Sequence, residues 1–350
     1  MVDANSSDDS SNARRALKMS LSMYGSDASD TPSASSDALN ALKLPKSTSP
    51  GSNGSHGSDA HHGYIKSRYK SEFEELAMLG EGVFGKVFRC RNRLDEKEYA
   101  IKVIPFSSEE QEKIVLEVKI LAKMCHPNVV TYHQAWIEDR LSASPPCSEG
   151  SSSSSTPSID KTLYIILELC FGTLESKESK DIKNNNVWKT INEIYSGLEY
   201  IHNQGVIHRD LTLQNIFLDR AGVAKIGDFG IARFCDEDGR ANLSENSGHG
   251  ALKYGAQELT ADIPYAVKAT DIYALGVVIF QLLYRDGGDS DITEATKNFT
   301  KNKILPTSWT RPLLAETLFQ MINDNPNFRP YLIDLKSLLH EEHSNKKRKM

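Results

Sequence analysis

The stretch His208-Arg209-Asp210-Leu211-Thr212-Leu213-Gln214-Asn215, followed by Gly227-Asp228-Phe229-Gly230, decides how this chain of 350 residues is interpreted. Asp210 supplies a carboxylate that can accept a hydroxyl proton, and Asn215 and Asp228 supply two oxygen ligands that suit Mg²⁺. Either stretch alone is short enough to arise by chance. In this order and spacing, the two stretches predict a site for magnesium-assisted phosphoryl transfer.

A glycine-rich segment precedes this region, Gly80-Glu81-Gly82-Val83-Phe84-Gly85-Lys86-Val87. Its glycines let backbone amides approach the phosphates of a nucleotide without side-chain collision. Followed by a helix, the same pattern would indicate a dinucleotide site, but a strand is expected after Gly85, which indicates a strand-turn-strand flap. Lys102 on the next strand can neutralise phosphates, and Glu117 can hold that lysine. Taken singly, both would be read as surface side chains; the ordered motifs favour the functional reading.

Composition divides the chain into a tail and one folded unit. Residues 1–64 are rich in Ser, Asp, Gly and Ala, so we expect a disordered tail. Residues 68–340 are apolar enough for one enzyme core. Within them, residues 140–160 form a Ser- and Pro-rich run that we expect to be a disordered insert. The basic tail 341–350 is open to three readings: a nuclear import signal, a phosphate-binding end or solvated charge.

The charge balance indicates no nucleic-acid or membrane partner. The chain has 41 basic and 47 acidic residues, a net charge of -6. No apolar run approaches the ~20 residues that span a bilayer, and the N-terminus lacks the order of a signal peptide. We therefore expect a cytoplasmic protein, with the nucleus as an alternative. Five cysteines without metal-ligand spacing fit reduced thiols: Cys90, Cys125, Cys147, Cys170 and Cys235.

The periodicity of apolar residues predicts a small antiparallel sheet followed by a helix-dominated half. A helix is expected over 109–124, and a second one from Val187 to Ile201, with Asn186 as its N-cap and Gly205 as its C-terminal stop. The expected strands of the first half are 73–79, 86–91, 99–105, 129–137 and 163–169.

With these motifs in place, the chain from about Phe73 to His340 resembles the eukaryotic protein kinases. Thr270-Asp271-Ile272-Tyr273-Ala274-Leu275-Gly276 is similar to the kinase helix that anchors the catalytic loop through Asp271, and Arg329 is similar to the arginine that pairs with Glu258. The resemblance implies an α+β, two-lobed protein kinase fold. A small β lobe would span about 68–169 and a larger helical lobe about 170–340, with ATP between them.

The resemblance also implies ATP and Mg²⁺ as cofactors and assigns roles to residues. Asp210, Lys102 and Glu117 would be catalytic, and Asn215 and Asp228 would hold the metal. Residues 168–170 would form the hinge that contacts the nucleotide. The implied ATP-binding residues are Leu79, Gly80, Gly82, Gly85, Val87, Ala100, Lys102, Glu168 and Cys170.

One subfamily matches in more detail. The segment Val129 to Glu138, which contains Ala135-Trp136-Ile137-Glu138 and precedes the insert, is similar to the kinases of the alpha subunit of eukaryotic translation initiation factor two. Ser71 to Leu76 and Gly227 to Ala232 also fit. This resemblance implies a stress-responsive serine/threonine kinase that phosphorylates that factor and lowers translation initiation.

The same resemblance implies a homodimer through the small lobes and a docking helix for the protein substrate. The helix candidate is Glu294 to Asn302, with Thr300 at the docking position; a solvated helix face is the alternative. For each dimer position the alternative is an ordinary surface side chain. The positions that match the dimer contacts are Arg68, Glu72, Asp95, Tyr99 and Tyr132.

Several residues depart from the family pattern. Thr212 replaces the lysine expected beside the transferring group, and Ala251 replaces the threonine that would bond that lysine. Asn246 stands where the activating phosphothreonine is expected, so Ser244 and Ser247 are the candidate phosphosites, unless the segment is ordered without phosphorylation. Two classes of function follow: a working kinase, and a pseudokinase or decoy that binds nucleotide and regulates an active relative.

Overall fold

The computed structural model describes residues 67–82, 85–140, 160–176, 187–242, 265–285, 292–309 and 311–336. All of them belong to the unit Tyr64–Met350, which separates from Met1–Gly63. The predicted tail 1–64, most of the predicted insert and the basic C-terminus lie outside these residues. So do the activation-segment positions Ser244, Asn246, Ser247, Ala251 and Glu258.

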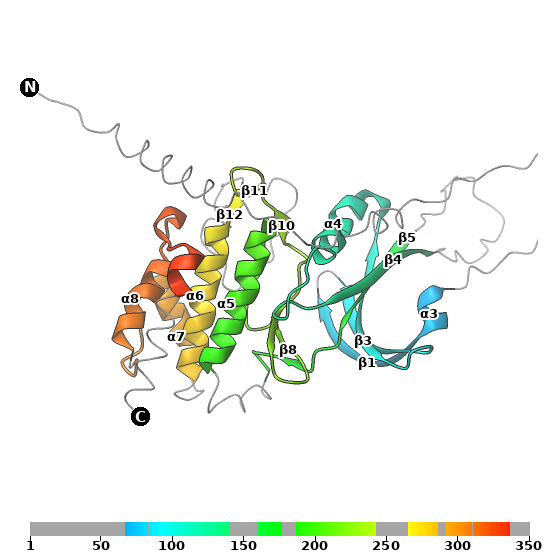
Figure 1. Ribbon diagram of the computed structural model, residues 1–350, viewed down its shortest axis with the longest axis horizontal. Helices are drawn as coiled ribbons and strands as arrows, with labels where there is room; N and C mark the ends of the chain where they lie inside the picture. The colour runs from blue at the N-terminus through cyan, green and yellow to red at the C-terminus, as the bar shows by residue number, and fades with distance from the viewer. Residues whose placement is uncertain are drawn as a thin grey trace, which may run out of the picture. The chain divides into compact units, whose positions relative to one another are not determined.

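Five strands form one antiparallel sheet in the order β1-β2-β3-β5-β4 (Figure 1). The short helix α3 (Arg68–Glu72) leads into the first strand. The sheet confirms the predicted strands of the first half. They are β1 (Phe73–Gly82), β2 (Gly85–Asn92), β3 (Glu98–Phe106), β4 (Tyr132–Arg140) and β5 (Asp160–Glu168).

The strand predicted from residue 129 begins three residues later than expected. Val129 makes a bridge to Ile226, and the Val130 amide donates to the Ile226 carbonyl oxygen at 2.9 Å. These backbone groups therefore pair with a strand of the helical half. The chain bonds to β5 from Thr131, whose carbonyl oxygen accepts the Glu168 amide, and pairs along β5 from Tyr132. The apolar run Val129-Val130 predicts the start of a strand, but periodicity does not say which strand is its partner.

Helix α4 (Gln111–Leu121) follows a 3-10 turn, Ser108–Glu110, and covers most of the helix predicted over 109–124. The Ser107 amide donates to Glu110 Oε2 at 3.1 Å, which satisfies a backbone donor at the start of the turn. Ile120 and Leu121 are buried, so the helix packs its apolar face onto the sheet and turns Glu117 inward.

The second half is built mainly from helices, as predicted. The long helices are α5 (Val187–Asn203) and α6 (Lys268–Arg285), followed by α7 (Ile292–Lys297), a π-helical turn (Asn298–Asn302), α8 (Pro312–Met321) and a 3-10 turn (Pro326–Phe328). Short strands complete it: β6 (Gly172–Thr173), β7 (Val206–Ile207), β8 (Ile216–Leu218), β9 (Ala224–Ile226), β10 (Arg233–Phe234), β11 (Arg240–Asn242) and β12 (Tyr265–Val267). Strands β6, β8 and β9 form a three-stranded sheet.

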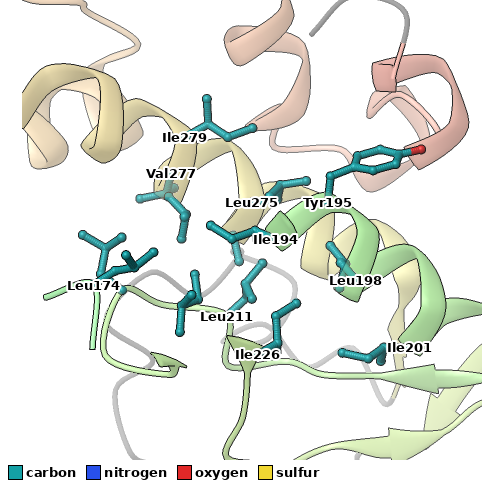
Figure 2. Close-up of a cluster of buried hydrophobic side chains, with 14 of the residues drawn as sticks. Leu174, Ile194, Tyr195, Leu198, Ile201, Leu211, Ile226, Leu275, Val277 and Ile279 are labelled. Carbon is teal, nitrogen blue, oxygen red and sulfur yellow. The ribbon is translucent and has the colours of Figure 1, made fainter. Parts of the chain in front are cut away.

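The main core lies where α5 and α6 meet the segments that carry the candidate site (Figure 2). Ile194, Leu198 and Ile201 recur on one face of α5 and are fully or almost fully buried, as their spacing predicted. Leu211 and Ile226 lie in the same cluster, so the site's own loop and strand are packed into the core. Gly205 ends the helix with a positive φ of 70°, a conformation that favours glycine.

Candidate active site

Lys102 on β3 lies at the centre of the site, between two carboxylates. Its Nζ atom donates to Glu117 Oε1 at 2.7 Å and to Asp228 Oδ1 at 3.0 Å. Glu117 comes from α4, and Asp228 follows β9, so three separate elements converge on one ammonium group. The side chains of Lys102 and Glu117 are only 10% and 6% exposed. The structure therefore brings together three residues that the sequence assigned to one site.

Both carboxylates of this cluster stabilise the charge of Lys102. Burial opposes the charged form of Lys102, but Glu117 and Asp228 outweigh it and raise the pKa of this lysine above its usual value. Burial also opposes the charge of Asp228, yet Lys102 and a nearby histidine lower the pKa of this aspartate. Burial raises the pKa of Glu117 against the charge of Lys102. Asp228 is thus held ionised beside a fixed cation, which suits a metal ligand.

The backbone around Asp228 is held in an uncommon conformation. Asp228 has a positive φ of 60°. The preceding Gly227 accepts a hydrogen bond from His208 Nε2 at 3.0 Å through its carbonyl oxygen, and the following Phe229 is fully buried with its ring 5.0 Å from that of His208. These contacts from the two flanking residues fix the direction of the aspartate side chain.

Asp271 anchors the catalytic loop from α6, as the sequence predicted. Its carboxylate is fully buried and accepts hydrogen bonds from the amides of His208 at 2.9 Å and Arg209 at 2.7 Å. His202 Nε2 contacts the same carboxylate at 2.8 Å. Burial opposes its charge, but these hydrogen bonds lower the pKa of Asp271. The loop that carries Asp210 is therefore tied to the helical core by one ionised side chain.

Asp210 and Asn215 lie together at the two ends of this loop. The Asn215 side-chain amide donates to Asp210 Oδ2 at 2.8 Å and to the Asp210 carbonyl oxygen at 2.9 Å. Burial raises the pKa of Asp210, and the Asp228 carboxylate adds to this effect, against His208 and Asn215. A raised pKa makes this carboxylate a better proton acceptor, as a general base requires.

The donor set fits Mg²⁺ bound together with phosphate oxygens. Because the Asn215 NH₂ group is used by Asp210, the amide oxygen of Asn215 is left as an acceptor for a cation. Asp228 supplies an ionised carboxylate. Among the residues that the structure describes, no three His, Cys, Asp or Glu side chains form a metal cluster. A site with one carboxylate and one amide matches a metal that keeps waters and substrate oxygens in its coordination shell.

The predicted nucleotide flap has the expected strand-turn-strand form. Gly80 pairs with Val87 and Gly82 with Gly85 across β1 and β2. Gly85 has a positive φ of 131°, and a Cβ there would lie 2.3 Å from the Val103 carbonyl oxygen, so no other residue fits. Leu79 is exposed, and Ala100 on β3 is buried. Val83 and Phe84, at the tip, lie outside the described residues.

The hinge contains an interaction that sequence reasoning missed. Lys225 Nζ on β9 lies 3.0 Å from Glu168 Oε1, and the same oxygen accepts a hydrogen bond from the Thr131 amide at 2.7 Å. Cys170 lies nearby: burial and Glu168 raise the pKa of its thiol to about 12. A lysine in the middle of a short buried strand, Ala224-Lys225-Ile226, was the available signal, since buried lysines need an anion.

Arg209 is buried next to a second arginine. Its Nε atom has no hydrogen-bond partner among the described residues. Burial and, after it, the charge of Arg233 lower the pKa of Arg209 to about 10. Two guanidinium groups in this arrangement favour an anion. The candidate phosphosites Ser244 and Ser247 lie outside the described residues.

The residues predicted for a dimer contact form pairs within one chain. Arg68 pairs with Glu72 at 2.9 Å and donates to Gln134 on β4 at 2.9 Å. The Tyr99 hydroxyl donates to Asp95 at 2.7 Å. Tyr132 is half-buried at the start of β4. Arg68, Glu72, Asp95 and Tyr99 thus lie in two local pairs, and both pairs reach the surface.

The structure also describes Thr300, predicted for substrate docking, and Thr212, which departs from the family pattern. Thr300 lies in the π-helical stretch Asn298–Asn302 that continues α7 without a break, so the helix predicted over 294–302 is present, and its hydroxyl donates to the Thr296 carbonyl oxygen at 2.9 Å. Thr212 lies in the catalytic loop itself and is buried. Its carbonyl oxygen accepts a hydrogen bond from the Asn215 amide at 3.1 Å. The side chain at this position therefore carries no charge toward the site.

Comparison with known proteins agrees with this geometry. The family model for the protein kinase domain matches residues 73–343. The chain is 34% identical over 307 residues to the eIF-2-alpha kinase GCN2 of Arabidopsis thaliana, covering 77% of this chain and 25% of that protein. It is 35% identical over 225 residues to the interferon-induced, double-stranded RNA-activated protein kinase of Mus musculus, covering 63% and 41%.

A more distant relative is the Wee1-like protein kinase of Oryza sativa, 31% identical over 221 residues, with 62% of this chain and 37% of that protein covered. The chain thus spans between a quarter and a half of the length of these curated relatives. Among the described residues, no helix has the length and apolar character needed to cross a bilayer.

Proposed function

The chain belongs to the protein kinase family, and from this premise we propose that it is an active serine/threonine kinase that uses Mg²⁺ and ATP. The observation that carries the proposal is the convergence of Lys102, Glu117 and Asp228 within 3.0 Å contacts. A pseudokinase has no need to keep a buried lysine between two carboxylates as well as an intact Asp210 and Asn215.

In this proposal the chain's residues perform alignment and proton transfer. Lys102 would hold phosphate oxygens, and Asp228 and Asn215 would hold the metal, which neutralises developing charge on the phosphates when bound. Asp210 would orient the substrate hydroxyl and accept its proton. The hydroxyl oxygen forms a bond to the γ-phosphorus, the bond between that phosphorus and the bridging oxygen breaks, and ADP leaves with the electron pair.

We propose the alpha subunit of eukaryotic translation initiation factor two as the substrate, with lower translation initiation under stress as the result. Support comes from the match of residues 129–138 and from the similarity to a relative that is named an eIF-2-alpha kinase. Thr300 would take part in docking this substrate. The chain would act in the cytoplasm, and a homodimer through the small sheet would bring Arg68, Glu72, Asp95, Tyr99 and Tyr132 of two copies together.

The second candidate function is a pseudokinase or decoy that binds nucleotide and regulates an active relative. One observation favours it: the uncharged, buried Thr212 stands where the family places a lysine. Loss of one preorganised charge slows such reactions by about 10² to 10³. A slow kinase and a decoy therefore differ in rate, and only a direct assay separates them.

The deciding experiment measures transfer of radiolabelled phosphate from ATP to the purified alpha subunit. The full chain should label the substrate, and Asp228→Asn should reduce labelling to background. Equal labelling by both proteins would remove the kinase proposal and leave the decoy. A parallel measurement of Mg-ADP binding by calorimetry tests nucleotide binding without any transfer.

A further inference from the structure

Lys225 is a buried lysine that the proposed transfer reaction does not use. It is the central residue of β9, and only 8% of it is exposed. Its Nζ atom lies 3.0 Å from Glu168 Oε1 at the end of β5. An ammonium group is placed in such a position only when an anion compensates for its lost hydration. The pair therefore depends on both partners.

The Glu168 carboxylate joins three separate segments. Besides the contact with Lys225, its Oε1 accepts a hydrogen bond from the Thr131 amide at 2.7 Å. The Glu168 amide in turn donates to the Thr131 carbonyl oxygen at 3.0 Å. The connection between α4 and β4, the first residue of the hinge and β9 thus meet at one side chain.

Strand β9 is itself bound tightly to the metal site. The Ile226 amide donates to the Asn128 carbonyl oxygen at 2.9 Å, and the Ile226 carbonyl oxygen accepts from Val130 at 2.9 Å. The Gly227 amide donates to the Asn215 carbonyl oxygen at 2.9 Å. Asp228 is the next residue. A continuous set of hydrogen bonds and one ion pair therefore connects the hinge to both proposed metal ligands.

We propose that Lys225 is a positioning residue that clamps the hinge to β9 and so determines how long the nucleotide stays bound. The inference rests on the nucleotide site of the proposed function. A nucleotide that contacts both the hinge backbone and the metal at Asp228 needs these two parts at a set separation. Without the clamp, the two contacts are no longer held together, and the nucleotide leaves faster.

A purely structural role for the pair makes a different prediction. A buried ion pair is by itself weak evidence for stability, and removal of one partner can destabilise the whole fold without any specific effect on ligands. The test must therefore measure local opening of the hinge and nucleotide binding separately from global unfolding.

The experiment uses the full chain with Lys225→Met, Glu168→Gln and the double variant. The Glu168 and Phe171 amides donate to the carbonyl oxygens of Thr131 and Leu218 in the structure. Their hydrogen exchange, measured in the absence of nucleotide, shows how readily the hinge opens. Calorimetry and stopped-flow fluorescence report the Kd and dissociation rate of Mg-ADP. The KM for ATP and kcat are measured at a temperature where every variant is folded.

Lys189→Met is the matched control. Lys189 is an exposed lysine paired with Glu193 at 3.4 Å, and Glu193 accepts the Ala224 amide of the same strand β9. The control therefore removes a lysine near β9 that does not reach the hinge. It should leave hinge exchange and nucleotide binding as in the wild type.

We expect faster hydrogen exchange at both hinge amides in either single variant. The Kd of Mg-ADP and the KM for ATP should each rise about 2- to 30-fold, whereas kcat should change less than about twofold. The double variant should add little, because both changes remove one interaction. Unchanged hinge exchange overturns the clamp, as does a kcat loss at constant KM or tighter nucleotide binding. A wild-type chain that binds no Mg-ADP overturns the proposed function instead.

Discussion

A 2.7 Å ion pair joins Lys102 on β3 to Glu117 on α4, and both side chains are nearly buried. The pair connects the sheet to helix α4, and it places the lysine within reach of Asp228. The position of α4 relative to the sheet therefore decides whether the lysine can serve the site.

Lys102→Met should lower the free energy of unfolding by about 3 to 5 kcal/mol, because it leaves the Glu117 carboxylate buried without a partner. Lys102→Met/Glu117→Leu should recover most of this stability. Neither variant should bind Mg-ATP normally. Urea unfolding and calorimetry measure the two effects, and equal stability of the single and double variants would contradict the importance of the pair.

Thr212→Lys should increase the rate of phosphoryl transfer by about 10² to 10³, because it returns a cation to the developing charge. Pairing it with Ala251→Thr supplies the hydroxyl that the family pattern associates with this lysine. The measurement is kcat with a saturating protein substrate. Thr212→Met, similar in length but uncharged, is the control; a gain with methionine as large as with lysine would show that charge is not the cause.

Asp271→Asn should destabilise the fold by about 2 to 3 kcal/mol at neutral pH, because the amide brings an NH₂ group against donors that now contact a carboxylate. The pKa of Asp271 is lower in the folded state than in the unfolded chain. Its contribution is therefore complete above the unfolded pKa of about 3.9 and is lost as pH falls toward the folded value.

The difference in stability between wild type and Asp271→Asn should accordingly shrink below about pH 4. Chemical unfolding across the range from acid to neutral pH measures it. A difference that stays constant over this range would mean that the Asp271 charge contributes nothing to holding the catalytic loop.

The charge reversals Arg68→Glu and Glu72→Arg test the proposed dimer. Within one chain these residues form a partly exposed i,i+4 pair, which contributes little to folding. If each Arg68 contacts Glu72 of a second copy, either reversal should raise the dimer Kd at least about tenfold, and the double reversal should restore it. Sedimentation equilibrium measures the dimer Kd. A double variant that is as monomeric as the single variants would contradict this contact.

Motif order and periodicity predicted the sheet, the helices α4 and α5 and the cluster of Lys102, Glu117 and Asp228. These features depend on short-range patterns: alternation in strands, a helical repeat in Ile191, Ile194 and Leu198, and fixed spacing in the catalytic loop. The start of β4 was predicted too early because the backbone of Val129 and Val130 pairs with β9, which no local pattern reveals.

By itself, the sequence determined the chemical inventory of the candidate site: the carboxylate proposed as proton acceptor, the oxygen groups proposed as metal ligands, the lysine proposed to hold phosphate, and the threonine at position 212. Only the tertiary structure decided that Lys225 pairs with Glu168, that Asp271 accepts three hydrogen bonds and that Arg68 pairs within its own chain. The physical reason is that motif spacing encodes local geometry, whereas the partner of a buried charge is selected by how distant segments pack together.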